Sequence, residues 1–343
     1  MPLETYLNEL TDVRAPLANA RLSELSALSR DEEAVLRARW GMIAPERRLS
    51  MVQQLSGLAE KDVTLDFAAV LKVALEDDDP GVRIAAIRGL WEYEQPDLVP
   101  RLIERLEMDE EPGVRAAAAT ALGQFAVHAE FDRLRPDDVT ALDRALEGAV
   151  KDRSQPLEVR AQAMAAVGAR SMPWVAELIR ETYAAGNSRL RLAAIQAMGR
   201  NCESEWLPSL IECLSDDDEE VRYEAALASG NIGEDDATPY LLPLIEDEDE
   251  EVRVAAIAAL GAISALSGSS SAREALESRT KDKNTAIREA VRLALEEVQF
   301  MEDPLAFPKS PDGQEEDMAL DEVQLIDDLL AFPRSPDDQE EDI

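Results

Sequence analysis

Apolar residues recur along most of this chain with the period of an α-helix, in short segments that each open on an apolar residue followed by arginine. In the first regular segment Val82, Ala86 and Gly89 stand at i, i+4 and i+7, and Leu90 adds a larger apolar side chain at i+8. This spacing predicts a helix with one packed face. The opening pair recurs, with successive spacings of 32, 45, 31, 31, 31 and 35 residues, at Val82-Arg83, Val114-Arg115, Val159-Arg160, Leu190-Arg191, Val221-Arg222, Val252-Arg253 and Ile287-Arg288.

A second apolar segment precedes these helices, as in residues 97–108, DLVPRLIERLEM. Each unit therefore predicts a helix, an acidic turn and a second helix, and a period near 31 residues is typical of a solenoid. A less regular unit comes first, with Arg48 standing 35 residues before Arg83. We expect an all-α fold of about eight helical hairpins in residues 31–300, preceded by an N-terminal helical cap in residues 1–30. Five second helices contain a glycine that we expect to end the helix, namely Gly123, Gly168, Gly199, Gly230 and Gly261.

The pattern VRxxAxxALG around the arginine resembles HEAT repeats, and most closely the short-period subclass of phycobilisome-lyase-like (PBS lyase HEAT-like) proteins. The resemblance covers residues 31–300 and implies a right-handed α-α superhelix, an armadillo-type fold. It also implies a ladder that joins an Asp of the turns to the Arg of the second helices. Ser154 and Ala185 take the place of the Asp in the fourth and fifth repeats, which puts the ladder in question there. The expected ladder residues are Asp77, Arg83, Asp109, Arg115, Asp216, Arg222, Asp247, Arg253, Asp282 and Arg288.

In the family that the chain resembles, positions one, five and nine after each ladder Arg line the concave surface. In six repeats these 18 positions hold only three charged residues, although 31% of the chain is charged. A row so poor in charge favours a groove for an extended or helical segment of another protein; the alternative is that tight curvature alone requires small side chains. The expected contacts, with Trp91 beside the row or else in the core, are Ile84, Arg88, Trp91, Thr120, Gln124, Gln196, Arg200, Tyr223, Leu227 and Asn231.

The net charge of −37 repels phosphate backbones and anionic lipid surfaces, so nucleic-acid and membrane functions are disfavoured. We expect a cytoplasmic protein, with no apolar stretch long enough to span a membrane.

Its two thiols, Cys202 and Cys213, are expected to be buried and unpaired. The acidic turns fit helix N-termini, where capping explains them. Alternatively they also receive a basic segment of a partner.

The acidic C-terminal tail, residues 301–343, carries a tandem duplication. Residues 294–318 and 319–343 are identical at 17 of 25 positions. We expect the tail to be largely disordered. Two copies of one motif could bind a bivalent target, or the second could fold back onto the groove; a duplication without function is the alternative. The motif residues are Leu305, Phe307, Pro308, Leu330, Phe332 and Pro333.

Catalytic chemistry has little support in this sequence. The single histidine, His128, is expected to be an ordinary helix residue, and we find no phosphate loop or metal-ligand spacing. We therefore expect a non-enzymatic scaffold or adaptor without cofactors, acting as a monomer on other proteins. Two alternatives stay open: a phycobilin lyase-like or chromophore-handling protein, which the resemblance implies, and end-to-end assembly of the solenoid.

Overall fold

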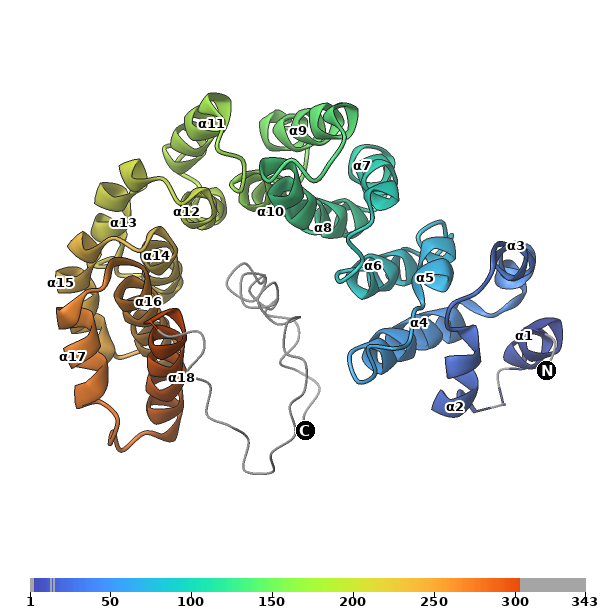
Figure 1. Ribbon diagram of the computed structural model, residues 1–343. Coiled ribbons are helices and arrows are strands. Elements are labelled where there is room, and N and C mark those ends of the chain that lie inside the picture. The colour runs from blue at the N-terminus through green and yellow to red at the C-terminus, as the bar shows by residue number, and fades with distance from the viewer. Residues whose placement is uncertain (1–2, 13, 15, 303–343) are drawn as a thin grey trace. The chain divides into compact units, whose positions relative to one another are not determined.

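The computed structural model describes residues 3–12, 14 and 16–302, and the regular elements within them are all helices (Figure 1). The α-helices are α1 (Leu3–Leu10), α2 (Asn19–Leu22), α3 (Arg30–Arg39), α4 (Pro45–Ala59), α5 (Ala68–Ala74), α6 (Pro80–Gly89), α7 (Val99–Met108), α8 (Pro112–Glu130), α9 (Pro136–Lys151), α10 (Leu157–Val167), α11 (Pro173–Tyr183), α12 (Ser188–Asn201), α13 (Leu207–Cys213), α14 (Glu219–Ile232), α15 (Thr238–Leu241), α16 (Glu250–Ser267), α17 (Ser270–Ser278) and α18 (Thr285–Glu302). Short 3-10 helices lie at η1 (Ser23–Leu25), η2 (Trp40–Met42), η3 (Pro96–Leu98), η4 (Ser204–Trp206), η5 (Asp235–Ala237) and η6 (Leu242–Glu246).

From α3 onward the helices follow one another as hairpins, each made of a first helix and a second helix. The second helices are α4, α6, α8, α10, α12, α14, α16 and α18, and the first helices precede them in order from α3 to α17. Second helices of neighbouring hairpins pack on each other, as α8 does on α10 and α14 on α16. First helices also meet, as α7 does α9. The predicted all-α solenoid is thereby confirmed.

The chain divides into two compact units, Met1–Ala197 and Met198–Ile343, so that α12 spans the boundary. In the first unit, α1 packs on α3 and α2 on α4, and the hairpins from α3 to α10 follow. Leu55, Val82 and Leu122 are fully buried in its core. In the second unit the core residues include Val252 and Leu260, both on α16 and both fully buried.

Aspartates of the acidic turns cap the second helices α6, α14 and α16, whereas Glu111 at the start of α8 makes no such bond. The Asp79 carboxylate accepts the Val82 N–H at 3.1 Å at the start of α6. Asp218 accepts the Glu220 N–H at 3.0 Å at the start of α14, and Asp249 accepts two N–H groups of α16 at 2.9 and 3.0 Å. These carboxylates satisfy N–H groups that have no partner inside the helix, so capping accounts for acid residues at these turns.

The expected glycine stops need a correction. Of the five glycines, only Gly168 lies just past a helix end, and the other four lie inside α8, α12, α14 and α16. Helices α14 and α16 end instead at Gly233 and Gly268, whose φ angles are 74° and 71°. These angles lie in the left-handed region, which glycine adopts at little cost in conformational free energy. The interior glycines mark close approach between helices: a Cβ built on Gly230 would lie 2.7 Å from the Ala259 Cα.

One of the two cysteines also differs from expectation. Cys213 is buried, but Cys202 is exposed at the end of α12, where its backbone takes a φ of 54°. Neither forms a disulfide.

Candidate partner-binding surface

Arg83, at the start of the second helix α6, joins consecutive hairpins. Arg83 donates from Nε and Nη2 to the two carboxylate oxygens of Asp109 at 2.8 and 2.7 Å, and from Nη1 to the carbonyl oxygen of Asp77 at 2.7 Å. The guanidinium therefore spans the turn of its own hairpin and the turn of the next one. A bidentate pair of this kind fixes orientation as well as distance. Arg83 is 9% exposed and Asp109 7%.

The second unit repeats this arrangement at Arg222. Its Nε and Nη2 atoms lie 2.8 and 2.9 Å from the carboxylate oxygens of Asp247, and its Nη1 atom lies 2.9 Å from the Asp216 carbonyl oxygen. The hydrogen bond from Arg222 lowers the pKa of Asp247, and the same bond raises the pKa of Arg222. Both side chains are less than a tenth exposed. The pair is therefore charged and largely shielded from water.

At other repeats the ladder residues have different partners. Arg115 donates to the Asp109 carbonyl oxygen at 2.7 Å, but its Nε atom meets the neutral Gln155 side chain at 2.9 Å. In the turn before α10, Asp152 accepts the Ser154 N–H. Asp152 stands eight residues before Arg160, whereas the ladder Asp of other repeats stands six residues before its Arg. The longer turn thus keeps its turn-forming Asp but moves it out of register with the ladder.

Three further ladder residues near the C-terminal end have partners within their own repeat. Arg253 donates to the Asp247 carbonyl oxygen at 2.7 Å and lies 3.4 Å from Glu250. Asp282 pairs with Arg279 at 3.4 Å, and its carbonyl oxygen accepts from Arg288 at 2.9 Å. Among the predicted ladder arginines, the structure therefore brings Arg83 and Arg222 to the Asp of the next repeat, and it gives Arg115, Arg253 and Arg288 neutral or local partners.

The first hairpin contains a buried polar cluster that the sequence prediction did not include. Arg48 donates to Asp77 at 2.8 Å and to the Ile43 carbonyl oxygen at 2.7 Å, and Trp40 donates its indole N–H to the same carboxylate. The sequence contained a signal for the Arg48–Asp77 contact, because the two residues are 29 positions apart, which is close to one repeat period. Trp40 has no counterpart in the repeat pattern and gave no signal.

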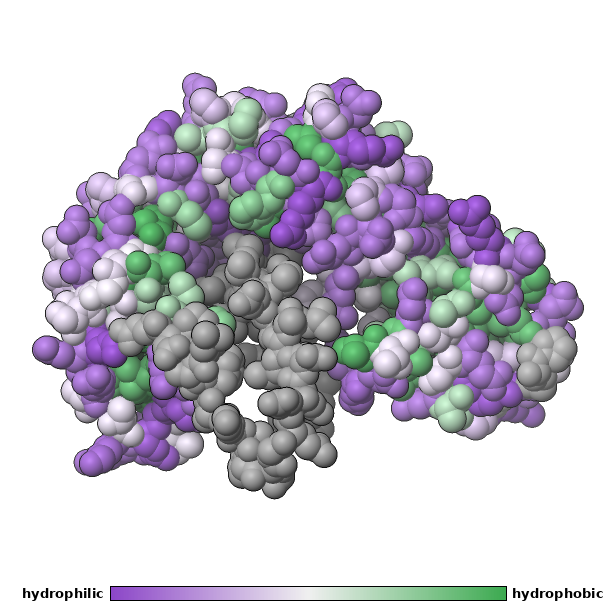
Figure 2. All heavy atoms as spheres, in the orientation of Figure 1, coloured by the Kyte–Doolittle hydropathy of each residue, from purple (hydrophilic) through white to green (hydrophobic). Residues whose placement is uncertain are grey.

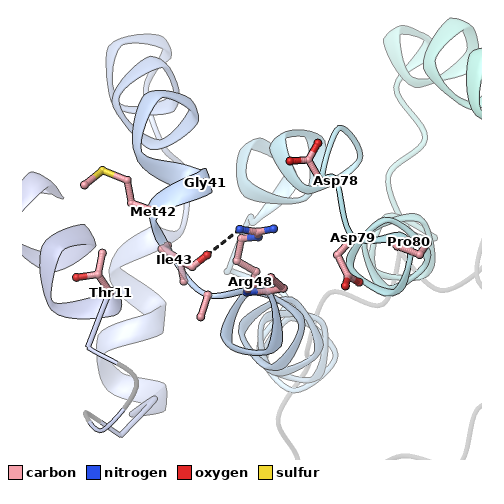
Figure 3. A pocket seen from close by; sticks show the side chains of 10 residues that line it. Thr11, Gly41, Met42, Ile43, Arg48, Asp78, Asp79 and Pro80 are labelled. Atoms are coloured by element: carbon pink, nitrogen blue, oxygen red, sulfur yellow. Dashed lines mark hydrogen bonds between the residues drawn. The ribbon is translucent and has the colours of Figure 1, made fainter.

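A shallow pocket opens beside this cluster, between the segment from Gly41 to Pro45 and the turn from Asp78 to Pro80 (Figure 3). Arg48 lies at its base, where the dashed line marks the bond to Ile43. Because Asp77 neutralises Arg48 and Asp79 caps α6, these polar groups are already engaged. We therefore assign this pocket a structural role.

The ten residues expected to contact a partner lie on second helices or directly after one, and we call them the second-helix row. Their side chains are exposed or partly exposed, with Arg88 and Trp91 the most open. The Trp91 side chain is 49% exposed, so it belongs to the surface and the core interpretation is wrong. By helix, the row consists of Ile84, Arg88 and Trp91 at α6, Thr120 and Gln124 on α8, Gln196 and Arg200 on α12, and Tyr223, Leu227 and Asn231 on α14.

The wider set of 18 positions is less continuous than the sequence suggested. Six of them are buried, because small side chains between closely packed second helices keep little accessible surface. Helix α10 has none of its three positions on the surface. The buried positions are Ala116, Ala161, Ala165, Ala169, Leu192 and Ala262.

Polar members of the row also bond to neighbouring hairpins. Thr120 donates to the Gln162 side chain at 3.0 Å, and Gln124 donates to the Tyr93 carbonyl oxygen at 3.4 Å. Burial, together with nearby Glu224 and Glu251, raises the pKa of Tyr223, so its phenol is neutral at physiological pH. The row is thus made of amide, hydroxyl and apolar groups, with Arg88 and Arg200 its charged members.

The remaining expected features are placed as follows. His128 is 7% exposed on α8, with its ring edge-on to Phe125 at 5.8 Å. Among the described residues no group of acidic, His and Cys side chains is arranged to hold a metal ion. In the same part of the chain, no helix has both the length and the apolar character to cross a membrane. The tail motif, at Leu305, Phe307, Pro308, Leu330, Phe332 and Pro333, lies outside the described residues.

On the face shown in Figure 2, hydrophilic side chains prevail and apolar ones form small groups between them. Stacked helical hairpins, bonded turn to turn by buried Arg–Asp pairs, define an α-solenoid repeat protein. The family model for HEAT repeats matches residues 67–153, 142–228 and 207–296. The chain therefore belongs to the HEAT-repeat family, as predicted from the residues around the arginines.

A search of curated proteins gives no match. Among solved structures, yeast importin-beta (Kap95p) is similar with a TM-score of 0.51 and 12% identity, covering 89% of this chain and 47% of that one. The CpcE–CpcF complex of phycocyanin lyase from Nostoc has a TM-score of 0.49 and 22% identity, covering 84% of this chain and 97% of that chain. Human deoxyhypusine hydroxylase has a TM-score of 0.34 and 20% identity, with coverages of 87% and 96%. At 12% identity, the likeness to importin-beta indicates a shared fold only.

Proposed function

We propose that this HEAT-repeat protein is a non-enzymatic scaffold that binds a segment of another protein along its second-helix row. The observation that carries the proposal is the chemistry of the row. Its ten members keep accessible side chains, and of the wider set of 18 positions only Glu92 is acidic, in a chain of net charge −37. An acidic protein with so few acids along one row offers a partner apolar and amide contacts there with little like-charge repulsion.

The row includes side chains suited to anchor a partner. Trp91 and Tyr223 offer aromatic area, and Arg88 offers a guanidinium, which are the three side-chain types that supply most energy in protein interfaces. Arg88 is exposed and has no ion-pair partner among the described residues. An amphipathic helix or an extended peptide with apolar anchors and an acidic residue fits this combination.

The acidic turns support a second, weaker contribution. Asp79, Asp218 and Asp249 already cap helices, but other acids of these turns, such as Asp78, Asp217 and Glu248, have exposed side chains. A basic segment of the partner could therefore extend from the row onto this rim, with an affinity that falls as salt rises.

The test compares proteins captured by the parent and by an Arg88→Glu, Tyr223→Ala double variant. A partner held by the row is lost from the variant by at least about tenfold in quantitative mass spectrometry, since each anchor contributes about 1–2 kcal/mol. The matched control is Arg144→Glu, Tyr240→Ala, which makes the same changes at exposed positions on the first helices α9 and α15.

Capture of the same proteins by the Arg88→Glu, Tyr223→Ala variant as by the parent would contradict the row. Loss of the same proteins from the double variant and from its control would indicate a general effect of charge or stability. Thermal melts of each variant followed by circular dichroism distinguish a loss of stability from a loss of binding. Capture with and without residues 301–343 then tests the tail motif as a second binding element.

The phycobilin lyase-like alternative stays a prediction from the sequence resemblance. Mixing the purified protein with a bilin tests it directly: an unchanged absorbance spectrum would remove it.

A further inference from the structure

One stretch of the first unit reverses the charge of the rest of the molecule. Residues 151–197 contain seven Lys and Arg against four Asp and Glu, a net charge of +3 in a chain of −37. Their two turns, residues 152–156 (DRSQP) and 184–187 (AAGN), replace the acid runs of the other turns, such as SDDDEE at residues 215–220. The reversal falls where the ladder loses its Asp.

The missing carboxylates leave ladder arginines without acidic partners. Arg115 meets Gln155 where Arg83 meets Asp109, and Arg160 donates its Nε–H to the Val150 carbonyl oxygen at 2.9 Å. Neither has an ion pair among the described residues. Each guanidinium is partly exposed, and its hydrogen bonds go to neutral groups.

Further bases surround these two arginines. Val150, which accepts from Arg160, adjoins Lys151, and Arg153 is exposed in the same turn with no ion pair among the described residues. Arg189 of the next hairpin reaches Glu158 at 2.9 Å, which brings it to the start of α10. We call this set the basic patch; it consists of Arg115, Lys151, Arg153, Arg160 and Arg189, with exposed Leu157 among them.

Five acids lie near the basic patch. Glu147 pairs with Lys151 at 2.6 Å, Glu158 pairs with Arg189, and Asp152 accepts from Ser154. Glu177 and Glu181 also attract Lys151, and Asp152 attracts Arg160. Arg115 and Arg153 have no ion pair among the described residues, and Arg160 has only the longer-range attraction of Asp152. A surface of this kind attracts an acidic segment, and an apolar side chain at its centre adds contact area.

We propose that the basic patch is the docking site of this chain's own acidic tail, residues 303–343. The tail carries 14 acids and two bases, so its charge complements the patch and is repelled by the acidic turns. Its 41 residues span up to about 140 Å when extended, so the tether does not confine it to the helix from which it departs. A tethered segment also acts at an effective concentration near the millimolar range, which favours it over a free acidic peptide.

This inference concerns a different surface from the second-helix row, so either proposal can fail alone.

Carbodiimide cross-linking of the full chain tests the contact, because Lys151 is the only amine in the patch. The reagent activates a tail carboxylate, which the Lys151 amine attacks to form an amide. At low protein concentration and 20 mM NaCl, links from Lys151 to residues 303–343 should exceed those from exposed Lys61 by about fivefold or more, and 500 mM NaCl should abolish the excess.

Charge reversal supplies the matched comparison. The double variant Arg153→Glu, Arg160→Glu should reduce the Lys151–tail links at least fivefold. The single variant Arg153→Glu should also reduce these links, and it should leave folding unaffected because Arg153 has no ion pair among the described residues. Arg30→Glu, Arg133→Glu, with the same change of net charge elsewhere in the first unit, should leave them unchanged. Equal links from Lys151 and Lys61, or Lys151 links only between two copies of the chain, would overturn the proposal.

Discussion

At the scale of single residues, the ladder aspartates perform two tasks with one carboxylate. Asp247 accepts from Arg222 of the preceding hairpin and also from the Asp249 N–H, at 2.9 Å, in its own turn. The first bond fixes the distance between hairpins, and the second fixes the turn that leads into α16. Asp109 does the same with Arg83 and the Glu111 N–H. A buried charge held this way stabilises the fold only while its partner remains.

Removing the arginine should therefore cost more than an exposed ion pair would suggest. Arg222→Ala leaves the Asp247 carboxylate nearly buried and uncompensated, and we expect a loss of about 3–5 kcal/mol in the free energy of unfolding. Urea unfolding followed by circular dichroism measures it. Arg253→Ala is the control, because Arg253 makes an ion pair with a half-exposed Glu250 and bonds to two carbonyl oxygens, and it acts on the Asp247 carboxylate only from a distance. About 1 kcal/mol is expected. Equal losses would show that the pair adds nothing.

The same pair predicts a pH dependence. Since the folded state lowers the pKa of Asp247, its contribution to stability is complete above the unfolded value of about 3.9 and is lost as pH falls through the lower folded value. The stability advantage of the parent over Asp247→Asn should thus be constant from pH 7 to 5 and shrink below pH 4. Urea midpoints at each pH measure this, and an advantage that grew on acidification would contradict the lowered pKa.

At the scale of helices, close approach between second helices distinguishes this fold from a loose bundle. Gly230 of α14 faces Ala259 of α16, and Gly261 of α16 faces Ala294 of α18. The small residues that the sequence placed on one helix face meet the glycines of the neighbouring helix. Packing at this distance leaves no room for another methyl group.

Gly230→Ala should therefore destabilise the protein even though alanine favours helices. The added Cβ would lie 2.7 Å from the Ala259 Cα, so the helices must separate, at a cost of about 1–3 kcal/mol against a propensity gain of about 1 kcal/mol. Gly148→Ala on α9 meets nothing within 4 Å and should stabilise by about 0.5–1 kcal/mol. Thermal melts of the two variants should shift in opposite directions; a stabilised Gly230→Ala would mean that the contact is not tight.

At the scale of the whole molecule, the last hairpin differs from those before it. Gly261 of α16 packs against the next helix, and the corresponding position on α18 is Glu296. Glu296 pairs with Arg292, which also pairs with Glu289. These side chains are about half exposed. A polar outer face of this kind is what a terminal repeat needs to avoid stacking on another molecule.

Making this face apolar should cause association. We expect Arg292→Leu, Glu296→Ala, next to the exposed Leu293, to give a concentration-dependent sedimentation coefficient, while the parent sediments unchanged between about 5 and 100 µM. Arg144→Leu, Glu147→Ala on α9 removes the same charges away from the end and should sediment like the parent. Association of the parent itself would favour end-to-end assembly instead.

The sequence alone determined the hairpins, the family and the positions of the ladder residues. These depend on the 3.6-residue helical period, on caps such as Asp79, and on the distance along the chain between repeats, all of which are local. The tertiary structure decided what depends on the spacing between neighbouring helices. It showed that Gly230 admits a neighbour rather than ending α14, that Ala165 is buried while Trp91 is exposed, and that a longer turn gives Arg115 a neutral partner. Such outcomes are set by atoms of different repeats meeting in space, which the order of residues along one helix does not specify.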